Sequence, residues 1–98
     1  MKFFDWNLEK NEALKAQRKI SFEDIIFSIG HDGVLDIIVH PGRNRYSNQK
    51  IFVVNIDDYV YLVPFVEDEQ TIFLKTIIPS RKMTKKYLGG KSDENRQR

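Results

Sequence analysis

The sequence predicts an α+β domain in which two N-terminal helices pack on a four-stranded antiparallel sheet that is followed by a short basic helix. Runs rich in β-branched and aromatic residues, separated by polar turns, succeed one another in the second half of the chain, as in a β-meander. Residues 7–30 instead carry helix caps and an apolar stripe at helical spacing. We expect a single domain over residues 1–90 and a disordered polar tail over residues 91–98.

Two helices are expected before the sheet. Asn7 is the expected N-cap of a surface helix over residues 8–19, with an extended segment in front of it. Ser21 and Asp24 approximate a capping box at the start of the second helix. One apolar face of this helix is formed by Phe22, Ile25, Ile26 and Ile29. Gly30 is expected to end it as a C′ glycine, and the helix should lie across the core face of the sheet.

Four strands are expected, over residues 34–39, 51–56, 59–66 and 71–78. The two-residue turn Asp57-Asp58 and the acidic turn 67–70 connect the last three. Counting outward from these turns assigns the side chains to two faces. The core face receives Phe52, Val54, Ile56, Tyr59, Tyr61, Val63, Phe65, Ile72, Leu74, Thr76 and Ile78. The second face receives Ile51, Val53, Asn55, Val60, Leu62, Pro64, Val66, Phe73, Lys75 and Ile77. In the first strand, Leu35, Ile37 and Val39 are expected on one side.

The second face is too apolar to be left to water, so a terminal helix, another subunit or a partner protein should cover it. A helix over residues 81–88, capped by Ser80, follows the last strand. Its i,i+4 pairs Arg81/Lys85 and Lys82/Lys86 form a basic strip. The opposite side carries Met83, Thr84, Tyr87 and Leu88 and could pack on the second face.

Composition narrows the class of protein. At 98 residues, with 41% hydrophobic and 31% charged residues, the chain can form one modest core. It has no cysteine, which excludes disulfides, thiolate metal sites and a cysteine nucleophile. No run approaches the roughly 18 apolar residues of a membrane span, and the first residues lack the pattern of a secretory signal. We therefore expect a cytoplasmic protein without membrane contact.

A set of cations is the chemistry that the sequence offers. The set consists of His40, Arg43, Arg45, Lys50, Lys75, Arg81 and Lys82 with the neighbouring tyrosines. Residues 40–50, with Tyr46 among them, form one polar connection, where binding groups concentrate. Cleavage of RNA by its own 2′-hydroxyl needs proton transfer, which histidine can supply, and cations that stabilise the phosphorane. Tyrosine can stack on a base. The same set would serve a nucleic-acid binder that does not cleave. No metal-ligand spacing or phosphate-binding glycine loop is present, so neither metal nor cofactor is expected.

Longer motifs occur at both ends of the chain. Residues 4–11 read F-D-W-N-L-E-K-N, residues 20–23 read I-S-F-E, and residues 77–87 read I-I-P-S-R-K-M-T-K-K-Y. These stretches resemble the "F-D-W-D-x-x-K", "G-V-S-F-E-E" and "I-I-S-A-R-K-A-T-x-x-E-R-x-x-Y" motifs of the BrnT family of bacterial type II toxins. The resemblance covers about residues 3–88. The chain departs from the family pattern "K-H-G" at residues 18–20, and from its "E-R-Y" at Asn44.

The resemblance implies a RelE-like fold and a metal-independent endoribonuclease that inhibits translation as the toxin of a toxin–antitoxin system. It also implies a cognate antitoxin, expected to be of the ribbon-helix-helix type, in a hetero-oligomer; a homodimer is a further possibility. We predict as catalytic residues Arg45, Arg81, Lys82 and His40. We predict as RNA-binding residues Arg43, Tyr46, Lys50, Lys75, Thr84, Lys85 and Lys86. The alternative is a non-catalytic basic module that binds nucleic acid or a partner protein. Cleavage requires Arg45 to share a cleft with Arg81 and Lys82.

Overall fold

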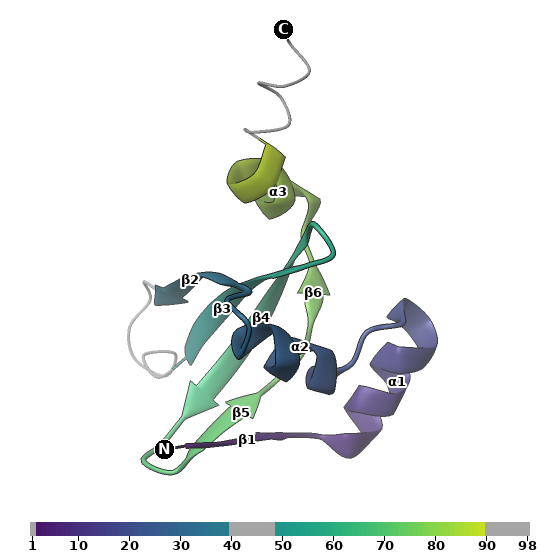
Figure 1. Cartoon of the computed structure of the whole chain (residues 1–98). Helices are drawn as coiled ribbons and strands as arrows, with labels where there is room; N and C mark the ends of the chain where they lie inside the picture. Colours follow the sequence, from purple (N-terminus) through teal and green to yellow (C-terminus); the bar gives the residue numbers. More distant parts are fainter. Residues whose placement is uncertain (1, 40–48, 90–98) are drawn as a thin grey trace, which may run out of the picture.

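The structure is a computed structural model that describes residues 2–39 and 49–89, and it confirms the α+β class (Figure 1). The strands are β1 (Phe3–Trp6), β2 (Val34–Val39), β3 (Gln49–Ile56), β4 (Tyr59–Glu67), β5 (Thr71–Leu74) and β6 (Ile78–Pro79). The helices are α1 (Leu8–Arg18), α2 (Phe22–Ile29), α3 (Arg81–Thr84) and the π-helical turn η2 (Lys85–Gly89). The predicted tail over residues 91–98 lies outside the described residues.

The sheet differs from the predicted four antiparallel strands. It has six strands in the order β1-β5-β4-β3-β2, with β6 also paired with β4. β1, expected only as an extended segment, pairs parallel with β5, and the Phe3 N–H donates to the Gln70 carbonyl at 2.8 Å. The sheet is therefore mixed, because a strand at the start of the chain joins the edge left open by the meander.

The predicted last strand is divided into β5 and β6 by a bulge. Phe65 pairs with Leu74 and Leu62 pairs with Ile78, so one extra residue lies between the two pairings. Because an extra residue exchanges the two faces, Ile77 is buried at 2% exposure and Ile78 is 44% exposed. The prediction that placed Ile78 in the core was wrong for this reason.

A proline explains where this ladder is interrupted. The Lys75 N–H donates to the Pro64 carbonyl at 2.8 Å, so Pro64 directs its backbone polar groups toward β5 and β6. Proline has no N–H that could donate to the last strand in turn, so the regular ladder stops at Pro64.

The two N-terminal helices begin as predicted. The Asn7 side chain accepts the Lys10 N–H at 2.8 Å, and Ser21 and Asp24 form a complete capping box. Gly30 ends α2 in a right-handed conformation with φ −78°, so the expected left-handed C′ glycine was wrong. The left-handed residue of this connection is Asp32, with φ 67°.

A buried asparagine joins the two helices. The Asn11 side chain accepts the Phe22 N–H at 2.8 Å and donates to Glu23 Oε1 at 2.9 Å. Asn11 is 2% exposed, and it supplies an acceptor to an amide that α2 itself leaves unpaired at its first turn.

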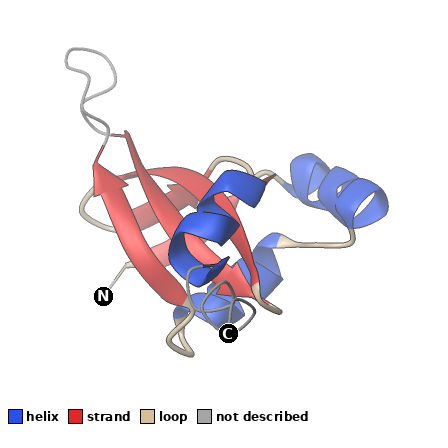
Figure 2. Ribbon diagram, turned by 90° about the horizontal axis from the view of Figure 1, so that it is seen from above, coloured by secondary structure: helices blue, strands red, loops and turns tan. Residues whose placement is uncertain are grey.

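The main core lies between α2 and the predicted core face of the sheet. α2 crosses this face, whereas α1 lies to one side (Figures 1 and 2). Most of the predicted core face is confirmed, whereas Ile77 takes the place predicted for Ile78 and Thr76 is not part of the core. The buried residues of the main core, from helices and sheet together, are Leu14, Ile20, Phe22, Ile25, Phe52, Val54, Val63, Phe65, Leu74 and Ile77.

The first predicted strand is present as β2, but its side assignment was partly wrong. A bulge between Val34 and Asp36 displaces Leu35 from the regular alternation. Ile37 and Val39 do lie on the core face, opposite Phe52 and Lys50. Both remain exposed because β2 is at the edge of the sheet. None of the helices described is long and apolar enough to cross a membrane.

Candidate nucleic-acid interface

The C-terminal helical segment separates charged from apolar side chains. Ser80 caps α3, since its Oγ accepts the Met83 N–H at 3.1 Å. Met83, Thr84, Tyr87 and Leu88 are partly buried toward the sheet. The exposed side carries Arg81, Lys82, Lys85 and Lys86, which we call the basic face. Among the residues that the structure describes, none of these four cations forms an ion pair.

Two hydroxyl groups fix this segment on the second face of the sheet. Thr84 Oγ1 accepts the Val60 N–H at 2.9 Å and donates to the Ser80 carbonyl at 2.8 Å. Tyr87 donates to Asp36 Oδ2 at 2.8 Å, so the segment extends from β4 to β2. Val53 and Val60, both on the second face, are fully buried. A terminal helix is thus the cover for this part of the face, one of the three covers anticipated from the sequence.

Lys75 lies on the same side of the sheet as the basic face. It follows the buried Leu74 and is itself exposed, so its side chain lies on the opposite side of the sheet from the core. Its N–H is bonded to Pro64, whereas the start of α3 is tied to Val60 through Ser80. Four residues of β4 correspond to about 13 Å, so Lys75 extends the positive surface along the strand.

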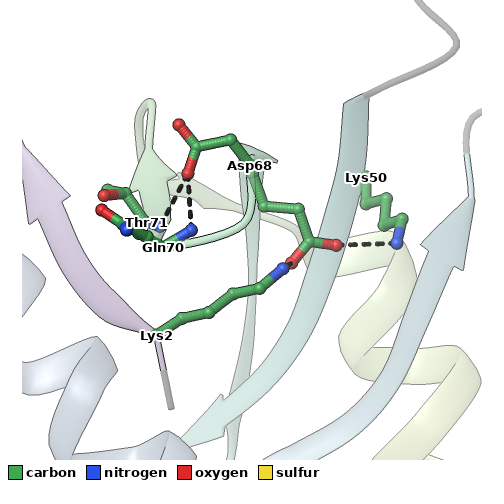
Figure 3. A network of polar contacts seen from close by, with 6 residues as sticks. Lys2, Lys50, Asp68, Gln70 and Thr71 are labelled. Atoms are coloured by element: carbon green, nitrogen blue, oxygen red, sulfur yellow. Dashed lines mark hydrogen bonds and ion pairs between the residues drawn. The ribbon is translucent and has the colours of Figure 1, made fainter.

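Lys50 belongs to a different part of the molecule. Its Nζ lies 2.8 Å from Glu67 Oε2, and Lys2 Nζ lies 2.8 Å from Oε1 of the same carboxylate (Figure 3). Hydrogen bonds from Lys2 and then Lys50 hold the pKa of Glu67 below its ordinary value. Lys50 pairs with Phe65 on β4, about 17 Å of strand from Val60 and on the core face. The charge of Lys50 is therefore used within the fold and lies far from the basic face.

The acidic turn beside this ion pair is also ordered by its own backbone. Asp68 Oδ1 accepts the N–H groups of Gln70 at 2.9 Å and Thr71 at 2.8 Å (Figure 3). These two bonds lower the pKa of Asp68.

Four of the predicted site residues, His40, Arg43, Arg45 and Tyr46, lie outside the described residues. Of the described ones, Arg81, Lys82, Lys85, Lys86 and Lys75 share one side of the sheet, and Lys50 does not. Thr84 uses its hydroxyl to hold the helix, as described above. The shared cleft required for cleavage stays a prediction, because its proposed second wall is in the part not described.

A cleft of about 470 Å³ is present elsewhere, at the end of α2. Phe27 and Tyr61 line it together with three carboxylates, those of Asp24, Asp32 and Asp57. Burial, and then the charges of Tyr59 and Asp57, raise the pKa of Tyr61. Among the described residues that line this cleft, Lys19 is the only lysine or arginine, and none is a predicted site residue, so the three carboxylates would repel an RNA phosphate there. In the described chain, no group of three or more potential metal ligands gathers.

Three residues with clear structural roles were not singled out from the sequence: Asn11, Pro64 and Asp36. Pro64 was detectable, because proline inside a central strand argues against an unbroken ladder on one side. Asp36 was detectable as the one charge in the strand Val-Leu-Asp-Ile-Ile-Val. Asn11 has no local signal, since its partners belong to the next helix.

Comparison with known proteins gave no further guide: no family model, no curated protein and no solved structure matched the chain.

Proposed function

We propose that this protein binds RNA through its basic face and cleaves it as the toxin of a bacterial type II toxin–antitoxin system, on a RelE-like arrangement. The observation that carries the proposal is the basic face itself: four exposed cations without ion-pair partners in the described chain. No acid occurs between Glu69 and Asp93, so nothing in this stretch of sequence neutralises them. A polyanion is the complementary partner.

The scaffold under the basic face favours binding of a defined ligand. Thr84 and Tyr87 tie the helix to two different strands, so the cations project from a fixed surface. Arg81 can bind a phosphate in bidentate fashion, and lysines add charge without directional demands. Binding should then depend strongly on salt, since each phosphate contact releases counterions.

Cleavage is the part that the resemblance to BrnT toxins supplies. In this proposal Arg81 and Lys82, with Arg45, stabilise the phosphorane charge, and His40 transfers a proton. The cognate antitoxin would neutralise the toxin in the cytoplasm, and inhibition of translation would follow from loss of RNA.

Binding is tested with a short single-stranded RNA and fluorescence anisotropy at several salt concentrations. Four phosphate contacts predict a loss of affinity of roughly 50-fold between 50 and 200 mM salt. Replacing Arg81 and Lys82 by alanine should lower the slope of log affinity against log salt by about 1.4. The matched control is Lys10→Ala with Arg18→Ala on α1, which removes the same charge from exposed positions. An equal effect of both pairs would contradict a localised site.

Cleavage is tested separately, by mapping cut transcripts and growth arrest after expression. The wild type should cut RNA and arrest growth, and Arg81→Ala with Lys82→Ala should lose both. RNA binding without cleavage would instead favour the second candidate, a non-catalytic basic module. One observation favours that candidate: the chain lacks the histidine of the family pattern "K-H-G" at residues 18–20 and has Asn44 in place of the glutamate of "E-R-Y".

A further inference from the structure

β2 forms one end of the strand order, and its outer side has specific polar groups. The Asn55 N–H donates to the Gly33 carbonyl at 2.8 Å, so alternate residues of β3 from Asn55 onward bond to the β2 side. In the register of β2 with β3, Asp36 is opposite Val53 and Ile38 is opposite Ile51, so these two are the backbone hydrogen-bonded pairs. Ile37 and Val39 therefore direct their backbone N–H and C=O groups away from the sheet.

The Asp36 carboxylate accepts a hydrogen bond from the first of these outward N–H groups. Its Oδ1 accepts the Ile37 N–H at 2.8 Å, while Oδ2 accepts the Tyr87 hydroxyl at 2.8 Å. The same arrangement occurs at the opposite edge of the sheet, where Asp5 Oδ1 accepts the Trp6 N–H at 2.8 Å. A carboxylate that takes an edge amide protects that edge against indiscriminate strand pairing.

The side chains of β2 nevertheless form a recognition surface. Ile37 is 48% exposed and Val39 is 61% exposed on the core face, and Leu35 is exposed at the bulge. An extended segment laid along such an edge gains main-chain hydrogen bonds and side-chain contacts together. The aliphatic residues of β2 thus favour the docking of an additional strand, provided that the Asp36 carboxylate receives another partner in place of the Ile37 N–H.

In the register centred on Ile37, a second copy of the chain is a poor occupant. Two-fold pairing of β2 about Ile37 would place the two Asp36 residues on one face as diagonal neighbours, with backbone positions about 7–8 Å apart. β2 contains no cation to balance them. A foreign strand with a basic residue opposite Asp36 would pair with the carboxylate and release the Ile37 N–H.

We propose that the outer edge of β2 is a docking site for an extended segment of another protein, with aliphatic side chains beside Ile37 and Val39 and a lysine or arginine facing Asp36. Asp36, held by Tyr87, is the residue that selects such a segment over a second copy of this chain. The docking site does not depend on RNA cleavage: it is formed by β2, whereas the basic face is formed by α3 and η2.

The test uses the whole chain and two synthetic seven-residue peptides that alternate valine with threonine, one with lysine and one with glutamate at the centre. In an NMR titration the lysine peptide should shift the amides of Ile37 and Val39 and bind about fivefold more tightly than the glutamate peptide. Asp36→Lys should reverse the preference, and Asp36→Asn should abolish it. Asp5→Lys, at the other edge, should leave it unchanged.

Three results would overturn the proposal. One is the absence of shifts at Ile37 and Val39 with either peptide up to about 5 mM, a concentration that detects even millimolar affinity. Another is equal binding of both peptides to the folded wild type. The third is a wild-type dimer in sedimentation whose Ile37 and Val39 amides are protected from exchange, which would assign the edge to self-association.

Discussion

Several features of this fold depend on single residues at which two segments of the chain lie in very close contact. Gly33 is the clearest example, since a Cβ built there would lie 1.7 Å from Ser28 Oγ and 2.8 Å from the Ser28 carbonyl oxygen. The same Ser28 hydroxyl donates to the Asn55 carbonyl at 3.0 Å, so it cannot withdraw without losing that bond. Position 33 thus requires glycine, because any side chain there would collide with Ser28 of α2.

Gly33→Ala should lower the free energy of unfolding by about 1–3 kcal/mol, because the new methyl group forces Ser28 and β2 apart. Chemical denaturation measures this loss. Gly30→Ala is the matched control, since a Cβ there meets nothing closer than 3.7 Å and the backbone is right-handed. A Gly33 variant as stable as the Gly30 variant would contradict the close packing of α2 on β2.

The Glu67 carboxylate gives a residue-scale pH dependence. Its pKa is lowered in the folded state by Lys2 and Lys50, so the native state favours the ionised form. Its contribution is therefore present above the unfolded-state pKa and is lost as pH falls through the lower folded-state value.

Glu67→Gln should consequently reduce stability at pH 7 and make the fall in stability between about pH 5 and pH 3 shallower. Denaturation midpoints measured across this range provide the comparison. Glu69→Gln, on the exposed part of the same turn, should leave the wild-type profile intact. Parallel profiles for the wild type and Glu67→Gln would show that the two lysines do not stabilise this carboxylate.

At the scale of elements, the turn between β3 and β4 has an unusual composition for its geometry. Asp57 and Asp58 both have positive φ, 54° and 65°, as a two-residue hairpin turn of type I′ requires. Glycine adopts this conformation without the steric cost that a Cβ imposes. The predicted hairpin is therefore correct, and its second turn residue is not the most favourable one.

Asp58→Gly should raise the free energy of unfolding by about 0.5–1 kcal/mol, the gain in the turn being partly offset by greater freedom of the unfolded chain. Asp58→Ala should lower it. Thermal denaturation of the two variants decides the matter, and a stabilising alanine would show that the positive φ carries no strain.

For the molecule as a whole, both faces of the sheet contain fully buried residues, with α2 on one face and the C-terminal segment over part of the other. Val63 lies in the main core and Val60 on the second face, and both are fully buried. A protein with an open second face would tolerate loss of Val60.

Val60→Ala and Val63→Ala should each lower the free energy of unfolding by about 1–3 kcal/mol, since each removes buried methyl groups. Val39→Ala, at 61% exposure, should stay within about 0.5 kcal/mol of the wild type. Urea denaturation of all three variants is sufficient. A Val60 variant that resembles the Val39 variant would contradict the cover provided by α3 and η2.

The amino-acid sequence by itself determined the helix starts, the meander and the charge of the last helix, because caps, periodicity and turn residues act within a few positions of one another. Asn7, Ser21 and the Asp57-Asp58 turn are examples. It also indicated that the second face needed a cover.

Only the tertiary structure decided which strands lie at the edges, where the last strand breaks, and which cations lie on the same side of the sheet. These features depend on partners far apart in the chain: β1 with β5, Pro64 with Lys75, and Lys50 with Glu67. Local pattern cannot report such pairings, because one extra residue in a strand exchanges its faces and a charge counts for binding only if no neighbour in space has already neutralised it.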